Sequence, residues 1–161
     1  MLVSFDEISE KARLWVYQAN RKLMSGEVEL LDRELEEFVK QWAAHGSDLE
    51  ASHTVMHDQF VVIAVDEAAN MATGCSIDSS VHKMQELSQK LGVDFFDRTK
   101  IAFILNDEIF LESLSNLKTK VDEGIIKEET PVFNNLVKNK KELKTSWIIP
   151  AKESWMSRYF N

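Results

Sequence analysis

The chain has 161 residues, of which 44% are hydrophobic and 29% are charged, as is usual for a globular protein with one core. Its formal net charge of −8 disfavours binding to phosphate backbones, so we expect no nucleic-acid partner. The single cysteine excludes an intramolecular disulfide, and the longest aliphatic and aromatic run, residues 60–65, is too short to span a membrane. The N-terminus lacks the positive charge and the apolar stretch of a signal peptide, and we therefore expect a cytoplasmic protein.

Residues 13–45 are predicted to form a strand followed by a helix. The strand at 13–19 is rich in aromatic and β-favouring residues and is apolar on both faces, which is typical of a central strand. The helix begins at Ser25, a favourable N-cap, and ends before Gly46, a favourable residue just beyond a helix. Its apolar residues recur at steps of three and four and should face the core: Val28, Leu31, Leu35, Phe38 and Trp42.

The middle of the chain is predicted to contain two hairpins with a helix between them. The expected elements are strands at 51–56 and 60–66, a helix at 79–91, and strands at 100–105 and 108–111. The run at 60–66 is almost continuously apolar and should be buried. Gly92 is expected to end the helix, and Asn106-Asp107 is expected to form the turn of the second hairpin.

The order β-α-β-β-α-β is that of a ferredoxin-like fold, which belongs to the α+β class. It predicts a four-stranded antiparallel sheet with two helices on one face. The strand at 108–111 should extend this sheet beside the fourth strand. We expect a single domain, because a chain of this length can bury one full core.

Residues 112–161 are predicted to form a C-terminal, partly helical extension that packs on the α+β core, residues 13–111, through its aromatic side chains. A helix is expected near 114–123, and a second helix is expected to open at Thr130-Pro131, because proline is favoured at the first helical position. An extended segment should follow at 146–149, before Pro150.

Residues 74–80, with the sequence Gly-Cys-Ser-Ile-Asp-Ser-Ser, connect the buried strand at 60–66 to the helix expected from Ser79. A helix entrance has free N–H donors and a partial positive charge, which suit a small anion. The predicted ligand-binding residues are Gly74, Ser76, Asp78, Ser79 and Ser80, with Arg13 nearby. The alternative is a structural turn in which Asp78 and the serines cap the helix themselves.

Cys75 offers a second functional interpretation. A helix N-terminus lowers the pKa of a thiol, and in a ferredoxin-like arrangement His45 should lie at the same end of the molecule. Cys75 would then act as a nucleophile with His45 as its base, and Arg13 or loop amides would stabilise an oxyanion. The alternative is that Cys75 is a small buried hydrophobic residue.

Other polar residues have simpler interpretations, and we expect no metal and no cofactor. His53 and His57 are predicted on one face of a strand, too far apart for a shared metal ion. Asp66-Glu67 with Asp78 resembles a ligand set for Mg²⁺, but a strand end and a helix cap also explain these residues. The basic segment 138–144 is predicted to form a solvated helix face.

Four strings carry a family resemblance: residues 13–21, Trp42-Ala43-Ala44-His45-Gly46, Gly74–Ser80 and Asp94-Phe95-Phe96-Asp97-Arg98. Together they resemble a bacterial family of small uncharacterised proteins, some of which carry the label ABC transporter ATPase. The chain contains no G-x-x-x-x-G-K-[ST] motif to bind nucleotide phosphates. The resemblance therefore implies a family without implying an ATPase activity.

The leading prediction is a non-catalytic binding or interaction module that recognises a small anionic ligand at residues 74–80, or a protein partner. The alternative is a small enzyme, of hydrolase or transferase type, that uses Cys75 and His45. The sequence leaves the ligand and the oligomeric state open.

Overall fold

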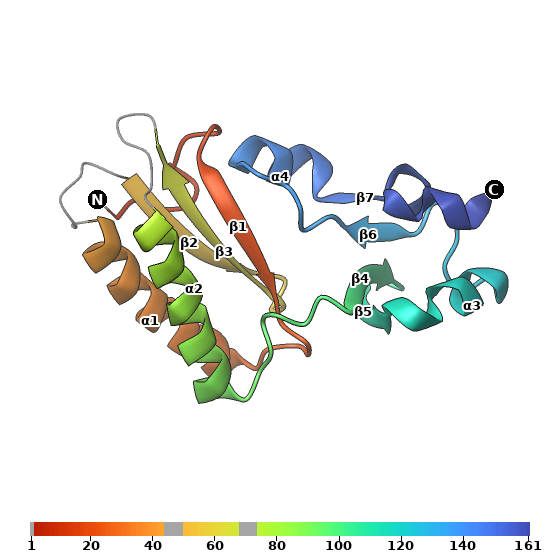
Figure 1. Ribbon diagram of the computed structural model, residues 1–161, viewed down its shortest axis with the longest axis horizontal. Helices are drawn as coiled ribbons and strands as arrows, with labels where there is room; N and C mark the ends of the chain where they lie inside the picture. Colours follow the sequence, from red (N-terminus) through yellow and green to blue (C-terminus); the bar gives the residue numbers. More distant parts are fainter. Residues whose placement is uncertain (1, 44–49, 68–73) are drawn as a thin grey trace.

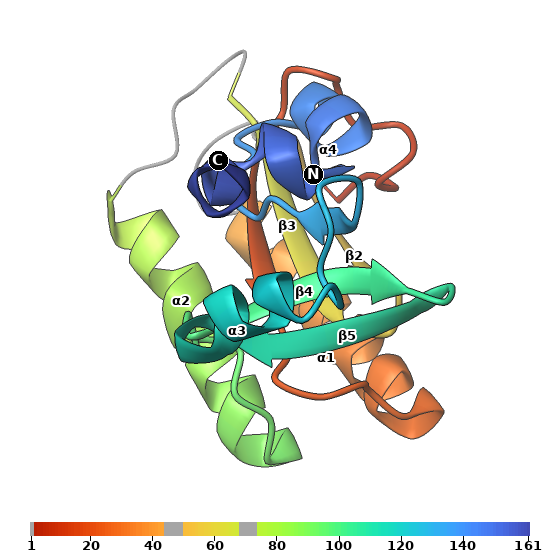
Figure 2. The ribbon, with the colours of Figure 1, turned by 90° about the vertical axis from the view of Figure 1, so that its right-hand side faces the viewer.

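The protein has an α+β fold with two antiparallel sheets, of three and four strands. The computed structural model describes residues 2–43, 50–67 and 74–161. Two long helices cover one face of the three-stranded sheet, and the four-stranded sheet with its short helices lies beyond the other face (Figure 1). The β4–β5 hairpin crosses over the strands of the first sheet (Figure 2).

The first sheet has the order β1-β3-β2, and the second has the order β5-β4-β6-β7. The strands are β1 (Arg13–Gln18), β2 (Glu50–Met56), β3 (Phe60–Asp66), β4 (Lys100–Leu105), β5 (Glu108–Ser113), β6 (Pro131–Phe133) and β7 (Ile148–Pro150). The α-helices are α1 (Ser25–Ala43), α2 (Gly74–Leu91), α3 (Leu117–Asp122) and α4 (Lys140–Ser146). Three short 3-10 turns are η1 (Leu114–Asn116), η2 (Ala151–Glu153) and η3 (Trp155–Phe160).

Strand β3 is the centre of the first sheet. It pairs with β1 and with β2, both antiparallel. Strand β1 lies at the edge of this sheet, so the prediction that the strand at 13–19 is central is wrong. Val61, Ile63 and Val65 point toward the long helices, and Phe60, Val62 and Ala64 point to the opposite face. All six residues are fully buried, which explains why this strand is apolar throughout rather than alternating.

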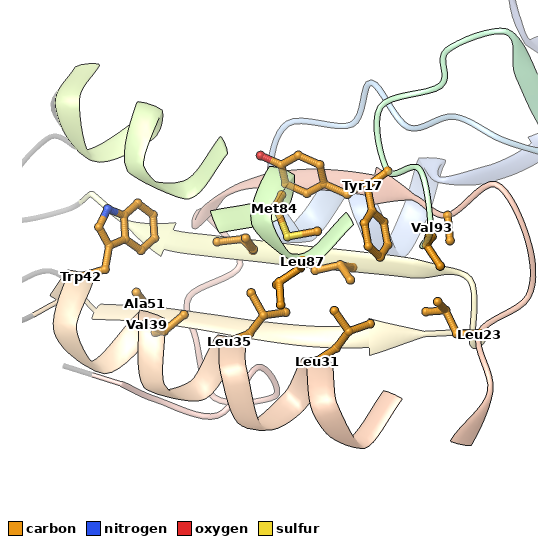
Figure 3. Packing of buried hydrophobic residues seen from close by; sticks show 14 of the residues in the cluster. Tyr17, Leu23, Leu31, Leu35, Val39, Trp42, Ala51, Met84, Leu87 and Val93 are labelled. Carbon is orange, nitrogen blue, oxygen red and sulfur yellow. The ribbon is translucent and has the colours of Figure 1, made fainter. Parts of the chain in front are cut away.

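The core under α1 and α2 follows the predicted helical periodicity in part. Leu31, Leu35 and Trp42 are buried as expected, and Met84 and Leu87 of α2 complete the layer (Figure 3). The apolar stripe on α1 is displaced slightly from the prediction. Val39 is fully buried, whereas Val28 and Phe38 are only partly buried at its edges.

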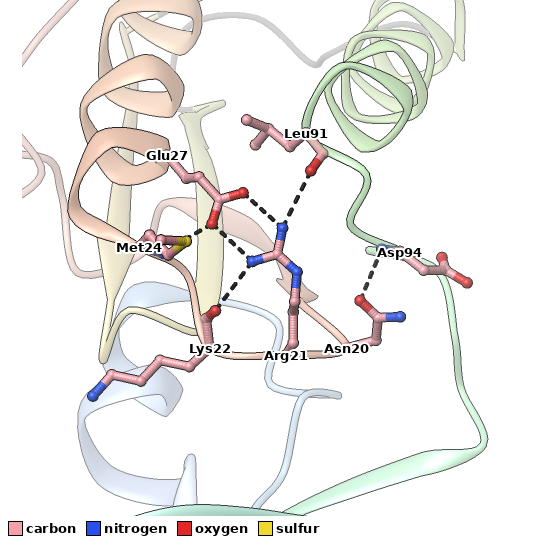
Figure 4. Close-up of polar contacts among 7 residues, drawn as sticks. All are labelled: Asn20, Arg21, Lys22, Met24, Glu27, Leu91 and Asp94. Carbon is pink, nitrogen blue, oxygen red and sulfur yellow. Dashed lines mark hydrogen bonds and ion pairs between the residues drawn. The ribbon is translucent and has the colours of Figure 1, made fainter.

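Residues 19–24 join β1 to α1 and, with Glu27 in the first turn of α1, also hold the end of α2 (Figure 4). Arg21 binds Glu27 through two hydrogen bonds of 2.7 Å, and it donates a third to the carbonyl of Leu91 at 3.2 Å. The same carboxylate accepts the N–H of Met24 at 2.9 Å. Because Val28 N–H donates to Met24 C=O, Met24 is the N-cap of α1 and not the predicted Ser25.

A second core lies between the two sheets. Phe60 of β3 contacts Phe133 and Trp147 with ring-centroid distances of 4.6 and 4.9 Å. Ala102 of β4 is buried in the same cluster, while its neighbour Phe103 is buried in a third cluster beneath α3 and η3. Strand β4 therefore has apolar contacts on both faces. One face packs between the two sheets, and the other packs against the C-terminal third of the chain.

The single ferredoxin-like sheet predicted from the sequence is not confirmed, because β4 lies in the second sheet. There it pairs with β5, as expected, and with β6. The free edge of β1 is occupied instead by residues 138–139, where Leu14 N–H donates to Lys138 C=O at 3.0 Å and Arg13 forms a bridge with Asn139. A strand buried on both faces has the same sequence pattern in either sheet, so the pattern does not distinguish the two arrangements.

Two further element boundaries differ from the predictions. Helix α2 begins at Gly74, five residues before the predicted start at Ser79. Pro131 opens the strand β6 rather than a helix. A proline at the first residue of a strand removes no ladder bond that the strand interior needs. Among the described residues, no helix is long and apolar enough to cross a membrane.

Candidate functional site

Arg13, predicted to assist an anion or oxyanion site, lies at the start of β1. Its Nη1 atom is 3.4 Å from Oε1 of Glu67, just after β3. Its guanidinium group also lies over the ring of Trp15, 4.8 Å from the centroid. Arg13 is half exposed, so both contacts are partly screened by solvent. In this structure its charge is matched by a carboxylate of its own chain.

The Cys75–His45 pair falls outside the residues whose side chains the structure describes. Gly74, Cys75 and Ser76 belong to the first turn of α2, and His45 lies between α1 and β2 in the undescribed segment 44–49. Helix α1 ends, and α2 begins, at the same end of the helical layer (Figure 1). The proximity of Cys75 to His45 therefore stays a prediction.

The other predicted ligand-binding residues lie on α2 and do not converge on one point. Ser80 is buried, and its hydroxyl group donates to the carbonyl of Ile77 at 2.6 Å. It also hydrogen-bonds the side chain of Tyr17, whose pKa is raised by burial. Asp78 and Ser79 lie on the exposed surface of the helix. The unpaired N–H groups of a helix beginning at Gly74 lie before Asp78, so an anion would bind earlier in the chain than predicted.

The two histidines considered as metal ligands are in different surroundings. His57 is not on the strand but in the turn after β2, with a positive φ of 57°, and its ring packs against Trp147 at 5.5 Å. His53 lies on β2, with Nε2 3.5 Å from Oδ1 of Asp32. Within the described parts of the chain, no three histidine, cysteine or acidic side chains are grouped as a metal site.

A pocket of about 730 Å³ lies beside β2 and is lined by residues other than those of the predicted site. Three segments far apart in the chain form its walls. They are the N-terminal residues 2–6, residues 52–54 and 56 of β2, and the α4 residues Lys140, Leu143 and Lys144, with Glu36 of α1 at the margin. We refer to it as the β2 pocket.

The N-terminal wall of the β2 pocket is fixed by backbone bonds. Val3 N–H donates to the carbonyl of Ala51 at 3.0 Å, and Leu2 forms a parallel bridge with the same residue. The α4 wall is fixed by a helix cap, in which Asn139 Oδ1 accepts the N–H of Glu142 at 2.8 Å. Regular structure and caps therefore hold both walls in place without a ligand.

Lys140 is the most unusual residue of the β2 pocket, because it is only 3% exposed. Its ammonium group donates to the backbone carbonyls of Asp6 at 2.9 Å and Ile8 at 2.8 Å. It also lies 5.6 Å from the ring centroid of Phe5. The prediction that residues 138–144 form a solvated helix face is therefore wrong for Lys140.

No family model, no curated protein and no solved structure matches this chain. The chemistry of the β2 pocket must therefore be inferred from its own side chains.

The spacing of residues along α4 indicates that the side chain of Lys140 is buried. Lys140, Leu143 and Trp147 are spaced by three and four residues, and all three are buried. Lys141 and Lys144 lie on the exposed side of the same helix. A lysine that shares a face with leucine and tryptophan is expected to run its stem through the core.

His53 contributes a neutral polar group to the margin of the pocket. Its side chain is 12% exposed, and Nδ1 is buried without a hydrogen-bond partner among the described residues. Burial lowers the pKa of His53, and the opposing influence of Asp32 is smaller. A neutral imidazole can donate or accept a hydrogen bond at its two nitrogens. The β2 pocket thus combines apolar walls with a buried cation, a neutral histidine and the hydroxyl groups of Ser4, Ser52 and Thr54.

Proposed function

We propose that the protein is a binding module that holds a small organic molecule in the β2 pocket. The observation that supports this most directly is the pocket itself, whose volume of about 730 Å³ lies within the usual range for ligand sites. Folds with this order of elements serve unrelated functions, so the proposal rests on the site and not on the topology.

The composition of the pocket also supports ligand binding. Leu2, Val3, Phe5, Met56 and Leu143 provide an apolar lining. Polar and charged side chains form the rest of the lining, and hydrogen bonds from them can fix the orientation of a ligand whose apolar part lies on these residues. Because the walls are held by backbone bonds, a ligand would meet a preformed site and lose little affinity to ordering it.

The neutral dye phenylnaphthylamine, whose fluorescence rises in apolar surroundings, tests the proposal. We expect saturable binding, with amide NMR shifts confined to residues 2–6, 52–56 and 140–144. Thr54 lines the pocket from β2, so Thr54→Trp should fill it and abolish binding.

Thr119→Trp is the matched control, because Thr119 is exposed on α3 and does not line the pocket. This variant should bind the dye as the parent protein does, and circular dichroism should show that both variants are folded. Shifts located elsewhere, or binding that survives Thr54→Trp, would contradict the proposal.

A further inference from the structure

We infer that Lys140 is an anion-binding residue and that the ligand of the β2 pocket is a small organic monoanion with an apolar body. This inference rests on the proposed function, since it names the ligand class of the same pocket. It concerns a different site from the start of α2, for which an anion was predicted from the sequence.

The hydrogen-bonding capacity of Lys140 is not used up by the protein. An ammonium group has three N–H donors and no acceptor. Two of them are directed to the carbonyls of Asp6 and Ile8. The third has no acceptor among the described residues, and Lys140 lines the pocket. A ligand atom in the pocket can therefore receive a hydrogen bond from a buried cation.

The charge of Lys140 is compensated only weakly, by the ring of Phe5 and by Glu10 at longer range, and it forms no ion pair among the described residues. The two carbonyl groups are dipoles without net charge, and no carboxylate of the described residues forms an ion pair with Lys140. The nearby Glu10 forms its ion pair with Lys144, at 2.5 Å on the exposed side of α4. A buried charge without a counter-ion is unfavourable, so an anion that reached Lys140 would gain more there than at a surface lysine.

The remaining charges of the pocket limit the charge of the ligand. Lys144 also lines the pocket, but its charge is paired with Glu10. Asp6 and Glu36 line it too, and their carboxylates repel a second or third negative charge. A polyphosphate is therefore disfavoured. A ligand with a single carboxylate, sulfonate or similar group at Lys140, and with its apolar portion against Phe5 and Leu143, matches both the charges and the apolar lining of the pocket.

Two dyes that share one skeleton test this inference. Anilinonaphthalenesulfonate has the rings of phenylnaphthylamine and one additional sulfonate. If Lys140 binds an anion, the sulfonated dye should bind about tenfold or more tightly than the neutral dye, as expected for a hydrogen bond to a buried charge. Lys140→Met removes the charge and keeps an apolar stem, so it should reduce the affinity ratio to near one.

Lys141→Met is the matched control, because Lys141 carries the same charge on the exposed side of α4. It should leave the ratio of affinities unchanged. An equal affinity for both dyes in the parent protein, or a ratio that survives Lys140→Met, would overturn the inference while leaving the proposed function intact. Failure of the neutral dye to bind in the pocket would instead overturn the proposed function.

A measurement on the parent protein covers the case in which Lys140→Met does not fold. In protein labelled with nitrogen-15 at lysine, the ammonium signal of Lys140 should shift when anilinonaphthalenesulfonate is added and remain in place with the neutral dye. A signal that responds equally to both dyes, or to neither, would show that Lys140 only anchors the N-terminal segment.

Discussion

Replacing Phe60 with alanine tests whether the two sheets share one cooperative core. Phe60 is fully buried on β3 and contacts Phe133 of β6 at 4.6 Å and Trp147 at 4.9 Å. Truncating a buried phenylalanine costs about 3–5 kcal/mol through lost transfer energy and the remaining cavity. The aromatic contacts place Phe60→Ala toward the upper part of that range, at about 4 kcal/mol, because each such pair contributes beyond its buried area.

Urea unfolding, followed by far-ultraviolet circular dichroism and by tryptophan fluorescence, measures this loss. Both signals should give one coincident transition, at a lower urea concentration than in the parent protein. Leu136→Ala is the control, since Leu136 is 81% exposed and its truncation should change stability by less than about 0.5 kcal/mol. A loss below about 2 kcal/mol for Phe60→Ala, or separate transitions for the two signals, would refute a shared core, given the usual cost of such a cavity.

Three further changes test local features of the fold. The hydrogen bonds from Arg21 lower the pKa of Glu27 from 4.5 to about 2, so its contribution to stability is complete above pH 4.5 and is lost as the pH falls toward 2. Glu27→Gln should therefore show a smaller loss of stability across that pH range in urea titrations, and equal losses in both proteins would contradict the assignment. Gly92 has a φ of 64°, and Gly92→Ala should lower the free energy of unfolding by about 1 kcal/mol, which thermal unfolding would detect. Asn135 accepts the indole N–H of Trp147 at 2.9 Å, so Asn135→Leu should cost about 1–3 kcal/mol and shift the tryptophan emission, whereas an unchanged stability would show that the indole finds another partner.

Local patterns predicted most of the individual elements. The spacing of Leu31 and Leu35, both buried, predicts the core-facing side of α1. The turn at Asn106-Asp107 has a positive φ at both residues, as a two-residue hairpin turn requires. No local sequence pattern indicates which of the two sheets β4 joins. It depends on β6 and on Phe133, which the chain supplies about 30 residues later, and no periodicity specifies such a partner.

The candidate site was harder to predict than the fold. Its walls come from the first residues, from β2 and from α4, and none of these segments contains a motif that identifies a ligand. The sequence predicts a solvated charge at Lys140, because lysines are rarely buried. Only the three- and four-residue spacing to Leu143 and Trp147 indicates its true environment, and this signal is weak in a helix of seven residues.

The bonds between the N-terminal segment and α4 also affect how the chain can be made. Lys140 binds the carbonyl of Asp6 across a separation of 134 residues, and Leu14 N–H meets Lys138. During synthesis, β1 and the residues before it lack these partners until residues 138–140 have left the ribosome. Contacts of such long sequence separation slow folding, because the entropy of loop closure is lost before the contacts form. Nascent chains stalled before residue 138 should consequently leave the N-terminal segment open to proteases, and emergence of residues 138–146 should protect it.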